Sequence, residues 1–330
     1  MSVMEFELIE RYFSAAGCPR DDVVLGVGDD AAILSPPAGH ELVVSTDTLV
    51  SGVHFFPDVS PYSLGHKALA VNLSDLAAMG ASPAWVTLAL TLPDVDEAWL
   101  REFSAGFSAL ASRYGVQLIG GDTTSGPLSI SVQALGFVEQ GRAWRRDAAK
   151  VGDLIYVTGT LGDAGLALQA RQQSLLFPPR YCDELSARLE KPTPRVEEAR
   201  SLRGLVNAAI DLSDGLLSDL GHILKASKVG GQIKLDALPL SSAFRMCRTD
   251  KVAQSLCDST WQALPLSAGD DYELCFTVSA EKRAALQRRL SQQGVVAQCI
   301  GVIDEGPGLR CVQKSGELIN IEQTGYEHFR

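Results

Sequence analysis

The sequence predicts a two-domain protein of mixed α/β and α+β class, and three observations support that prediction. Apolar runs of about five residues, typical of strands, alternate along the chain with longer segments of helical periodicity. A length of 330 residues, with 46% hydrophobic and 21% charged residues, suffices for one large core or two moderate ones. A polar, arginine-bearing stretch at residues 140–152 separates two such sets of elements. We therefore expect domains at residues 1–140 and 141–330.

The expected elements follow the hydrophobic pattern in chain order. Short apolar runs predict strands at residues 41–46, 84–92, 117–119, 129–138, 154–158, 208–212 and 272–278. Apolar residues three or four apart predict helices at residues 64–79, 97–114, 164–171, 215–226 and 281–293. Gly162, Asp163 and Gly165 are interpreted as no more than a helix start.

Charge and cysteine content limit the classes of partner and the cellular compartment that this protein can have. A net charge of −11 disfavours nucleic acid and anionic membranes as partners, and an anionic substrate would need a metal ion to enter. Seven cysteines without CxxC or zinc spacing indicate a reduced compartment and small buried thiols. The acidic start lacks the order of a signal peptide, and the longest apolar run is too short to span a bilayer. We expect a cytoplasmic protein.

Six short acidic stretches carry the chemical signal. In each, aspartate stands beside Gly, Ser, Thr or Asn and close to an apolar run, an arrangement that delivers carboxylates into one cleft. Such a cleft would hold divalent cations, and through them phosphates. The stretches cover residues 26–31, 45–55, 72–80, 120–124, 211–216 and 268–274.

Two of these stretches suggest magnesium ligands. The strand at residues 41–46 breaks into Ser45, Thr46 and Asp47, whose oxygens suit Mg²⁺; the alternative is a plain turn after the strand. In the helix at residues 64–79, Asn72 and Asp75 lie beside the buried stripe. They either line a cleft or belong to a solvated helix face. Leu69, Leu73 and Leu76 form that stripe.

Two further stretches suggest phosphate contacts. Gly120 and Gly121 let backbone amides approach a ligand before Asp122 is presented, although a turn explains them as well. The segment at residues 211–215 joins a strand to a helix whose first N–H groups favour phosphate. Its Ser213 or Asp214 is otherwise a helix N-cap.

The remaining signals are weaker. The glycine-rich GVGDDAA is compatible with a mobile loop that covers phosphate, with Asp29 and Asp30 as metal ligands, but it matches no established nucleotide motif. Arg146, with two neighbouring arginines, either binds phosphate or belongs to a solvated linker. His54 is a lone histidine at the end of an apolar, glycine-bearing stretch, and such residues are usually structural.

In this combination and order, the chain resembles the thiamine-monophosphate kinase family, within the superfamily that includes aminoimidazole ribonucleotide synthetase and selenophosphate synthetase. The resemblance extends from GVGDDA, STDTLVSGVHF and HKALAVNLSDLAAMGA through LIGGDTT and GDLIYVTGTLGDA to DLSDGL, GDDYELCF and TGYEHF. It implies the two-domain fold of that superfamily, with N-terminal α/β domains that dimerise through their sheets and bind ATP and Mg²⁺. The C-terminal α+β domain would close each active site.

The resemblance also implies an activity and the roles of individual residues. The activity is ATP-dependent phosphorylation of thiamine monophosphate to thiamine diphosphate with several Mg²⁺ ions, the final step of thiamine diphosphate biosynthesis. Metal ligands would be Asp30, Ser45, Thr46, Asp47, Asp75, Asp122, Asp211 and Asp214, and catalysis would depend most on Asp47, Asp122 and Asp214. ATP would contact Gly121, Asp122, Arg146 and Ser213. Thiamine monophosphate would contact His54, Asp270 and Tyr326.

Two departures from the family and two rival functions stay open. The family commonly has Glu where this chain has Asp270, so a shorter side chain must reach the substrate directly or through water. Position 326 is an aromatic stacking site in the family, and Tyr326 preserves the ring. One rival is another ATP-dependent enzyme of the superfamily that activates an amide or carbonyl oxygen. The other is a non-catalytic, metal-binding maturation scaffold.

Overall fold

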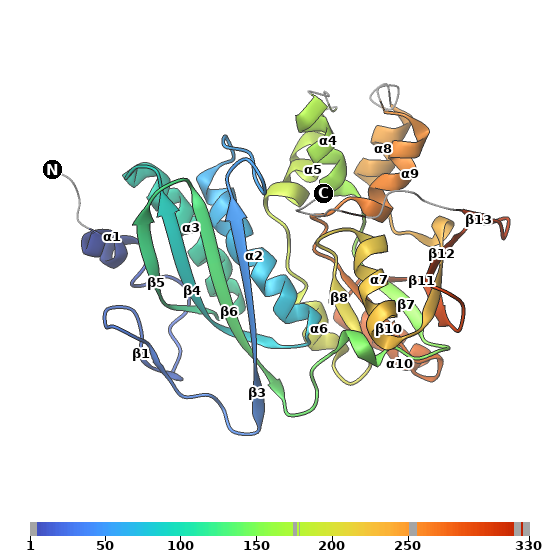
Figure 1. Ribbon diagram of the computed structural model, residues 1–330, viewed down its shortest axis with the longest axis horizontal. Helices are drawn as coiled ribbons and strands as arrows, with labels where there is room; N and C mark the ends of the chain where they lie inside the picture. The colour runs from blue at the N-terminus through green and yellow to red at the C-terminus, as the bar shows by residue number, and fades with distance from the viewer. Residues whose placement is uncertain (1–4, 174–176, 178, 251–255, 320–324, 326–330) are drawn as a thin grey trace. The chain divides into compact units, whose positions relative to one another are not determined.

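The computed structural model describes residues 5–173, 177, 179–250, 256–319 and 325. The chain divides into two compact units, Met1–Ala143 and Trp144–Arg330, which we call unit 1 and unit 2 (Figure 1). This division falls inside the arginine-bearing stretch and close to the expected boundary at residue 140.

The described part of unit 1 contains a four-stranded sheet with the order β3-β6-β4-β5 and two long helices on one face (Figure 1). β4 and β5 are parallel, and the other neighbours are antiparallel. The elements are β3 (His40–Val50), α2 (Pro61–Ala78), β4 (Ser82–Leu92), α3 (Glu97–Tyr114), β5 (Gln117–Ser125) and β6 (Ser129–Glu139).

Two strands of unit 1 are longer than the sequence predicts. β3 pairs with β6 through Val50, and β5 pairs with β4 through Ser125. Asp47 and Asp122 therefore lie within the sheet, and the expectation that they follow strand ends is wrong. Polar residues continue these strands because backbone pairing does not depend on side-chain polarity and part of the sheet is exposed.

Sequence signals at both ends explain the bounds of α2 and α3. Ser60 caps α2 with its hydroxyl, and Pro61 occupies the first turn, where its missing N–H has no helical partner. Asp96 caps α3 by accepting two backbone N–H hydrogen bonds. Gly115 ends α3 in the left-handed conformation, with φ at 67°.

The two helices touch through a reciprocal pair of glycines. A Cβ atom at Gly65 of α2 would lie 2.0 Å from the carbonyl oxygen of Phe103. A Cβ atom at Gly106 of α3 would likewise lie 2.0 Å from the carbonyl oxygen of Tyr62. Because only glycine permits this backbone approach, the pair fixes the position of α2 against α3.

A small hairpin covers part of the other face of the sheet. β1 (Val23–Leu25) pairs with β2 (Ile33–Leu34), and both pack against a buried cluster that contains Trp85 and Phe137. The indole nitrogen of Trp85 donates a hydrogen bond of 2.9 Å to Asp22, which also pairs with Arg20. The short helix α1 (Glu5–Tyr12) contacts α3.

The described part of unit 2 contains a seven-stranded sheet with the order β13-β12-β9-β11-β7-β10-β8. Its pairs are antiparallel except β12 with β9, which agrees with the expected α+β class. The strands are β7 (Leu154–Thr158), β8 (Ala209–Asp211), β9 (Gly230–Lys234), β10 (Leu274–Val278), β11 (Ala297–Asp304), β12 (Leu309–Val312) and β13 (Leu318–Ile319).

This sheet is buried on both faces along β7. Ile155 and Val157 belong to a core cluster with Leu220 and Ile223 of α7, whereas Tyr156 stacks on Phe276 with ring centroids 5.6 Å apart. Burial of alternate side chains on both faces explains the continuous apolar run of β7. The helices of unit 2 are α4 (Asp163–Gln173), α5 (Pro179–Glu190), α6 (Val196–Leu202), α7 (Leu216–Ser227), α8 (Ser242–Thr249), α9 (Asp258–Ser267) and α10 (Arg283–Gln293).

The structure bears on the expectations of no membrane span and of buried cysteines. None of the described helices is long and apolar enough to cross a membrane. Cys247, Cys275 and Cys311 are buried, as expected, whereas Cys18 and Cys299 are only half-buried. Cys257 is exposed at the start of α9, so the expectation of burial is wrong there, because this residue precedes the helix as its N-cap.

Candidate active site

Two residues of α2 contact strand β3. The carboxylate of Asp75 accepts a hydrogen bond from the hydroxyl of Ser45, and the side-chain oxygen of Asn72 accepts one of 3.1 Å from the backbone nitrogen of Asp47. Asn72 is fully buried, so the solvated-face alternative is wrong for it. The helix stripe that includes Leu73 is fully buried as predicted, and it directs the polar residues beside it onto β3.

The strand register brings Asp47 and Gly121 to one level of the sheet. Asp47 pairs with Val132, Val132 with Leu88, and Leu88 with Gly121. Three strand spacings of about 4.8 Å separate β3 from β5. Asp122 is the next residue of β5 and pairs with Ala89, so it lies one residue beyond this level. Asp47 and Asp122 therefore share a ligand only if that ligand extends across the sheet.

Gly121 and Thr46 have structural roles of their own. A Cβ atom at Gly121 would lie 1.8 Å from the carbonyl oxygen of Leu88, so close strand approach alone requires glycine there. The hydroxyl of Thr46 lies 3.4 Å from the side-chain nitrogen of Gln133. Since side chains alternate along a strand, Thr46 lies on the opposite sheet face from Ser45.

Asp30 and His54 occupy loops of unit 1. Asp30 is exposed after β1, and its backbone nitrogen donates a hydrogen bond of 2.8 Å to the carboxylate of Asp29. The ring nitrogen Nδ1 of His54 accepts a hydrogen bond of 3.0 Å from the backbone nitrogen of Val50. This contact leaves Nε2 as the protonated nitrogen of the neutral ring.

In unit 2, the segment DLSDGL joins β8 to α7. Asp211 is the last residue of β8 and is buried. The carboxylate of Asp219 accepts hydrogen bonds of 3.1 Å from the backbone nitrogens of Asp214 and Gly215. Gly215 is the N-cap residue, so the N-cap interpretation of Ser213 and Asp214 is wrong. Asp219, which sequence reasoning missed, binds from inside the helix the N–H groups of the N-cap residue and of the residue before it.

The charge of Arg146 acts on Asp219 and so reaches this segment. Burial raises the pKa of Asp219 to about 7, the negative charge of Asp214 adds to the rise, and the positive charge of Arg146 opposes it. Arg146 begins a 3-10 helix, Arg146–Ala148, and its carbonyl accepts a hydrogen bond of 2.7 Å from Ser227 of α7. Its neighbour Arg145 instead pairs with Asp147 at the surface.

The segment GDDYEL runs antiparallel to DLSDGL. The backbone nitrogen of Asp270 donates a hydrogen bond of 2.9 Å to the carbonyl of Ser213, and that of Tyr272 donates one of 2.8 Å to Leu212. Asp270 has φ at 66° and Tyr272 has φ at 48°, a region that residues other than glycine rarely adopt. Asp270, the predicted thiamine monophosphate contact, is therefore hydrogen-bonded through the backbone to Ser213, a predicted ATP contact.

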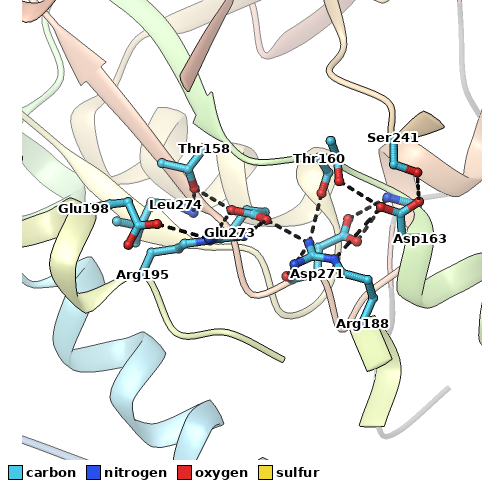
Figure 2. A network of polar contacts seen from close by, with 11 residues as sticks. Thr158, Thr160, Asp163, Arg188, Arg195, Glu198, Ser241, Asp271, Glu273 and Leu274 are labelled. Carbon is cyan, nitrogen blue, oxygen red and sulfur yellow. Dashed lines mark hydrogen bonds and ion pairs between the residues drawn. The ribbon is translucent and has the colours of Figure 1, made fainter. Parts of the chain in front are cut away.

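Figure 2 shows a buried ionic network that begins directly after this turn. The carboxylate of Glu273 is fully buried and accepts two hydrogen bonds from Arg195, of 2.6 and 2.5 Å. It accepts further hydrogen bonds of 2.8 Å from Arg188 and 2.7 Å from Thr158. Sequence reasoning missed Glu273, although a glutamate inside the apolar run of an expected strand was a signal for it.

Two more buried carboxylates complete the network. Both oxygens of Asp271 lie 3.0 Å from the backbone nitrogen of Gly162. Asp163 begins α4 as predicted, but it is more than a helix start. Its carboxylate is buried and accepts hydrogen bonds of 2.8 Å from Thr160 and 2.6 Å from Ser241. Burial raises the pKa of both carboxylates.

Tyr326 lies outside the described residues, but its neighbour Gly325 is described. A Cβ atom at Gly325 would lie 2.7 Å from the carbonyl oxygen of Asp214 and 2.8 Å from the Cβ of Ser218. The chain therefore passes over the start of α7 one residue before Tyr326.

The predicted metal ligands are divided between the units. Asp211 and Asp214 belong to unit 2, and the other six belong to unit 1. All offer oxygen, the donor that Mg²⁺ prefers, so the donor chemistry fits. Within the described ranges, no three His, Cys, Asp or Glu residues are grouped closely enough to hold a metal ion together.

Comparison with known proteins decides the family. The family models for AIR synthase related protein match residues 28–138 with the N-terminal domain and residues 150–314 with the C-terminal domain. Thiamine-monophosphate kinase of Escherichia coli K12 is 51% identical over 330 residues, which cover 100% of this chain and 99% of the relative. This chain belongs to the thiamine-monophosphate kinase family.

Solved structures of thiamine-monophosphate kinases share the fold. The enzyme from Stenotrophomonas maltophilia K279a matches with a TM-score of 0.83 and 48% identity, over 91% of this chain and 93% of that chain. AaThiL complexed with AMPPCP and TMP matches with a TM-score of 0.77 and 30% identity, over 92% of each chain. The predicted family and superfamily fold are thereby confirmed.

Proposed function

We propose that this chain transfers the γ-phosphoryl group of ATP to the phosphate of thiamine monophosphate, giving thiamine diphosphate and ADP. The observation that carries the proposal is the full-length identity to thiamine-monophosphate kinases. A solved family member that binds AMPPCP and TMP together supports the choice of both substrates.

The chemistry explains why carboxylates dominate the predicted site. The acceptor is a phosphate monoester whose second pKa is near 6, so it is largely deprotonated at neutral pH and needs no general base. The main obstacle is repulsion between two polyanions. Magnesium ions, held by Asp30, Ser45, Thr46, Asp47, Asp75, Asp122, Asp211 and Asp214, would neutralise that charge.

The chain's own residues then bind and orient the substrates. We assign Gly121, Asp122, Arg146 and Ser213 to ATP, because a guanidinium and backbone amides suit phosphate oxygens. We assign His54, Asp270 and Tyr326 to thiamine monophosphate. The bond between Asp270 and Ser213 supports a site in which both substrates lie close together.

We also propose a homodimer formed through the unit 1 sheet. Leu42 and Val44 of β3 are 48% and 50% exposed and lie on the face away from α2. Exposed apolar side chains on a sheet face suit burial against a second copy. Light scattering tests this proposal, with a monomeric mass as the contrary result. A cytoplasmic location stays a prediction from the sequence.

A product assay tests the activity. Purified protein is incubated with ATP, Mg²⁺ and thiamine monophosphate, with free thiamine in a parallel tube, and the products are identified by mass spectrometry. We expect thiamine diphosphate from the monophosphate alone, and none after EDTA treatment. Phosphate release with another acceptor would favour the rival amide or carbonyl activation, and metal binding without ATP turnover would favour the maturation scaffold.

A further inference from the structure

The turn that carries Asp270 is strained. Among the described residues, the non-glycine residues with positive φ are Lys228, Asp270 and Tyr272. Asp270 and Tyr272 are separated by a single residue. A bulky aromatic residue at φ 48° is an outlier. Such conformations persist only where the surrounding structure fixes them, and they concentrate at functional sites.

Hydrogen bonds hold this turn at four consecutive residues, alternately through the backbone and through the side chain. Asp270 and Tyr272 are held through their backbone nitrogens by the DLSDGL segment, at 2.9 and 2.8 Å. Asp271 and Glu273 are held through their carboxylates by groups near the end of β7, as Figure 2 shows. Arg188 connects the two carboxylate-bearing residues, since one of its nitrogens donates to Glu273 and also to the backbone carbonyl of Asp271 at 3.3 Å.

The hydrogen bonds to Glu273 fix the orientation of its carboxylate. Arg195 binds both carboxylate oxygens with a planar fork, and Thr158 binds one of them while its hydroxyl accepts a hydrogen bond of 2.8 Å from the backbone of Leu274. The Glu273 side chain is 0% exposed and the two arginine side chains are 17% exposed. A buried ion pair is a weak source of stability compared with apolar packing, whereas a bidentate pair adds geometric specificity.

We propose that Glu273, gripped by Arg188 and Arg195, is a positioning residue that holds the left-handed turn and thereby sets Asp270 for thiamine monophosphate. The proposal rests on the function proposed above and extends it to residues outside the predicted site. It explains why a fully buried glutamate is paired with two arginines whose side chains are only 17% exposed.

Gly159 offers a way to disturb Glu273 without altering a charge. A Cβ atom at Gly159 would lie 2.1 Å from one Glu273 oxygen and 2.5 Å from its carboxyl carbon, at a φ of 54°. Gly308 has φ at 56° and nothing within 4 Å of such a Cβ atom. Gly308→Ala is therefore a matched control that carries the same backbone strain without the contact.

Steady-state kinetics of the full-length protein test the proposal. We expect Gly159→Ala and Glu273→Gln to raise KM for thiamine monophosphate by about tenfold or more, with KM for ATP changed by less than about twofold. Gly308→Ala should leave both values unchanged. Arg195→Lys, which keeps the charge but loses the fork, should have a smaller effect than Arg195→Ala.

KM does not depend on the fraction of folded enzyme, so partial unfolding does not imitate this result. A lowered melting temperature with unchanged KM values would mean that the network is merely structural and would overturn the proposal. An equal rise in both KM values would overturn it too. If the unmodified protein makes no thiamine diphosphate, the proposed function fails; normal activity with unshifted variants rejects the positioning role alone.

Discussion

The hydroxyl of Ser45 donates a hydrogen bond to the carboxylate of Asp75, which ties the middle of strand β3 to helix α2. Two positions away on the strand, the backbone of Asp47 bonds to Asn72, one turn earlier on the helix. These two contacts make the strand and the helix a single frame for the half-buried carboxylates of unit 1.

A binding experiment tests the use of this frame for metal. We expect Asp75→Ala to weaken Mn²⁺ binding, measured by electron paramagnetic resonance, by about tenfold, and Ser45→Ala to weaken it less, because the hydroxyl carries no charge. The double variant should show a non-additive effect, since the two side chains touch. Thr48→Ala, on the opposite face of the strand, is the control; equal losses in all variants would contradict the assignment.

The sheet carboxylates of Asp47 and Asp122 should control turnover. Asp47→Ala and Asp122→Ala are expected to lower kcat by about a hundredfold or more, because each removes a charge that balances phosphate repulsion. Circular dichroism should remain that of the unmodified protein. Asp94→Ala, an exposed loop aspartate of the same unit, should retain full activity. Near-normal turnover in either site variant would refute its role.

The glycine contact between α2 and α3 predicts a stability effect. Gly106→Ala forces a methyl group against the carbonyl of Tyr62, so we expect unfolding to become easier by about 1–3 kcal/mol, measured by urea denaturation. Gly221→Ala, inside α7 with nothing within 4 Å, should instead stabilise by about 0.5–1 kcal/mol. Stabilisation by both substitutions would show that helix propensity, not contact, decides the result, and destabilisation by Gly221→Ala would contradict the expected gain.

Asp271 predicts a pH dependence of stability. Its pKa is raised well above the usual value by burial, with Arg188 opposing and Asp163 and Glu273 adding to the rise. Because the folded pKa is the higher one, this carboxyl's contribution to stability is complete below about pH 4 and is lost as pH rises towards the folded pKa. The unfolding free energy of Asp271→Asn relative to the unmodified protein should therefore increase from pH 5 to pH 8. A pH-independent difference would argue against this.

Cysteine labelling should single out Cys257. Hydrogen bonds from Ser259 and then Thr260 lower the pKa of its thiol to about 7, whereas burial raises the pKa of Cys311 to about 11. With iodoacetamide between pH 6 and pH 9, we expect Cys257 to react first, with a half-maximal rate near pH 7. Peptide mass spectrometry would contradict this if Cys311 reacted as quickly.

Strong local signals predicted much of the fold. The capped helices α2 and α3 and strands such as β4 carry clear periodicity, so their existence and type could be predicted. β9, which begins with two glycines, and the short strands β12 and β13 have no such pattern and depend on sheet pairing. The missed helices α1, α5, α6, α8 and α9 are at most 12 residues long and gain their stability from packing.

The same distinction applies to the site. Asp75 and Asp270 stood out because their segments combine acids with small polar residues. Glu273, Asp271 and Asp219 act through burial and through partners 50 or more residues away or within one helix turn, and a single sequence shows neither property. The extension of β5 through Asp122 was missed because its polar residues satisfy the strand ladder without any apolar run.

The alternation of side chains along strand β3 restricts which insertions and deletions the sequence tolerates. Its odd-numbered residues from Val43 to Leu49 meet α2, and its even-numbered residues, among them Val44, lie on the other face. Inserting or deleting one residue early in the strand would exchange the two sets, placing carboxylates where apolar side chains lie. Length changes should therefore be tolerated before His40, and only in pairs within the strand.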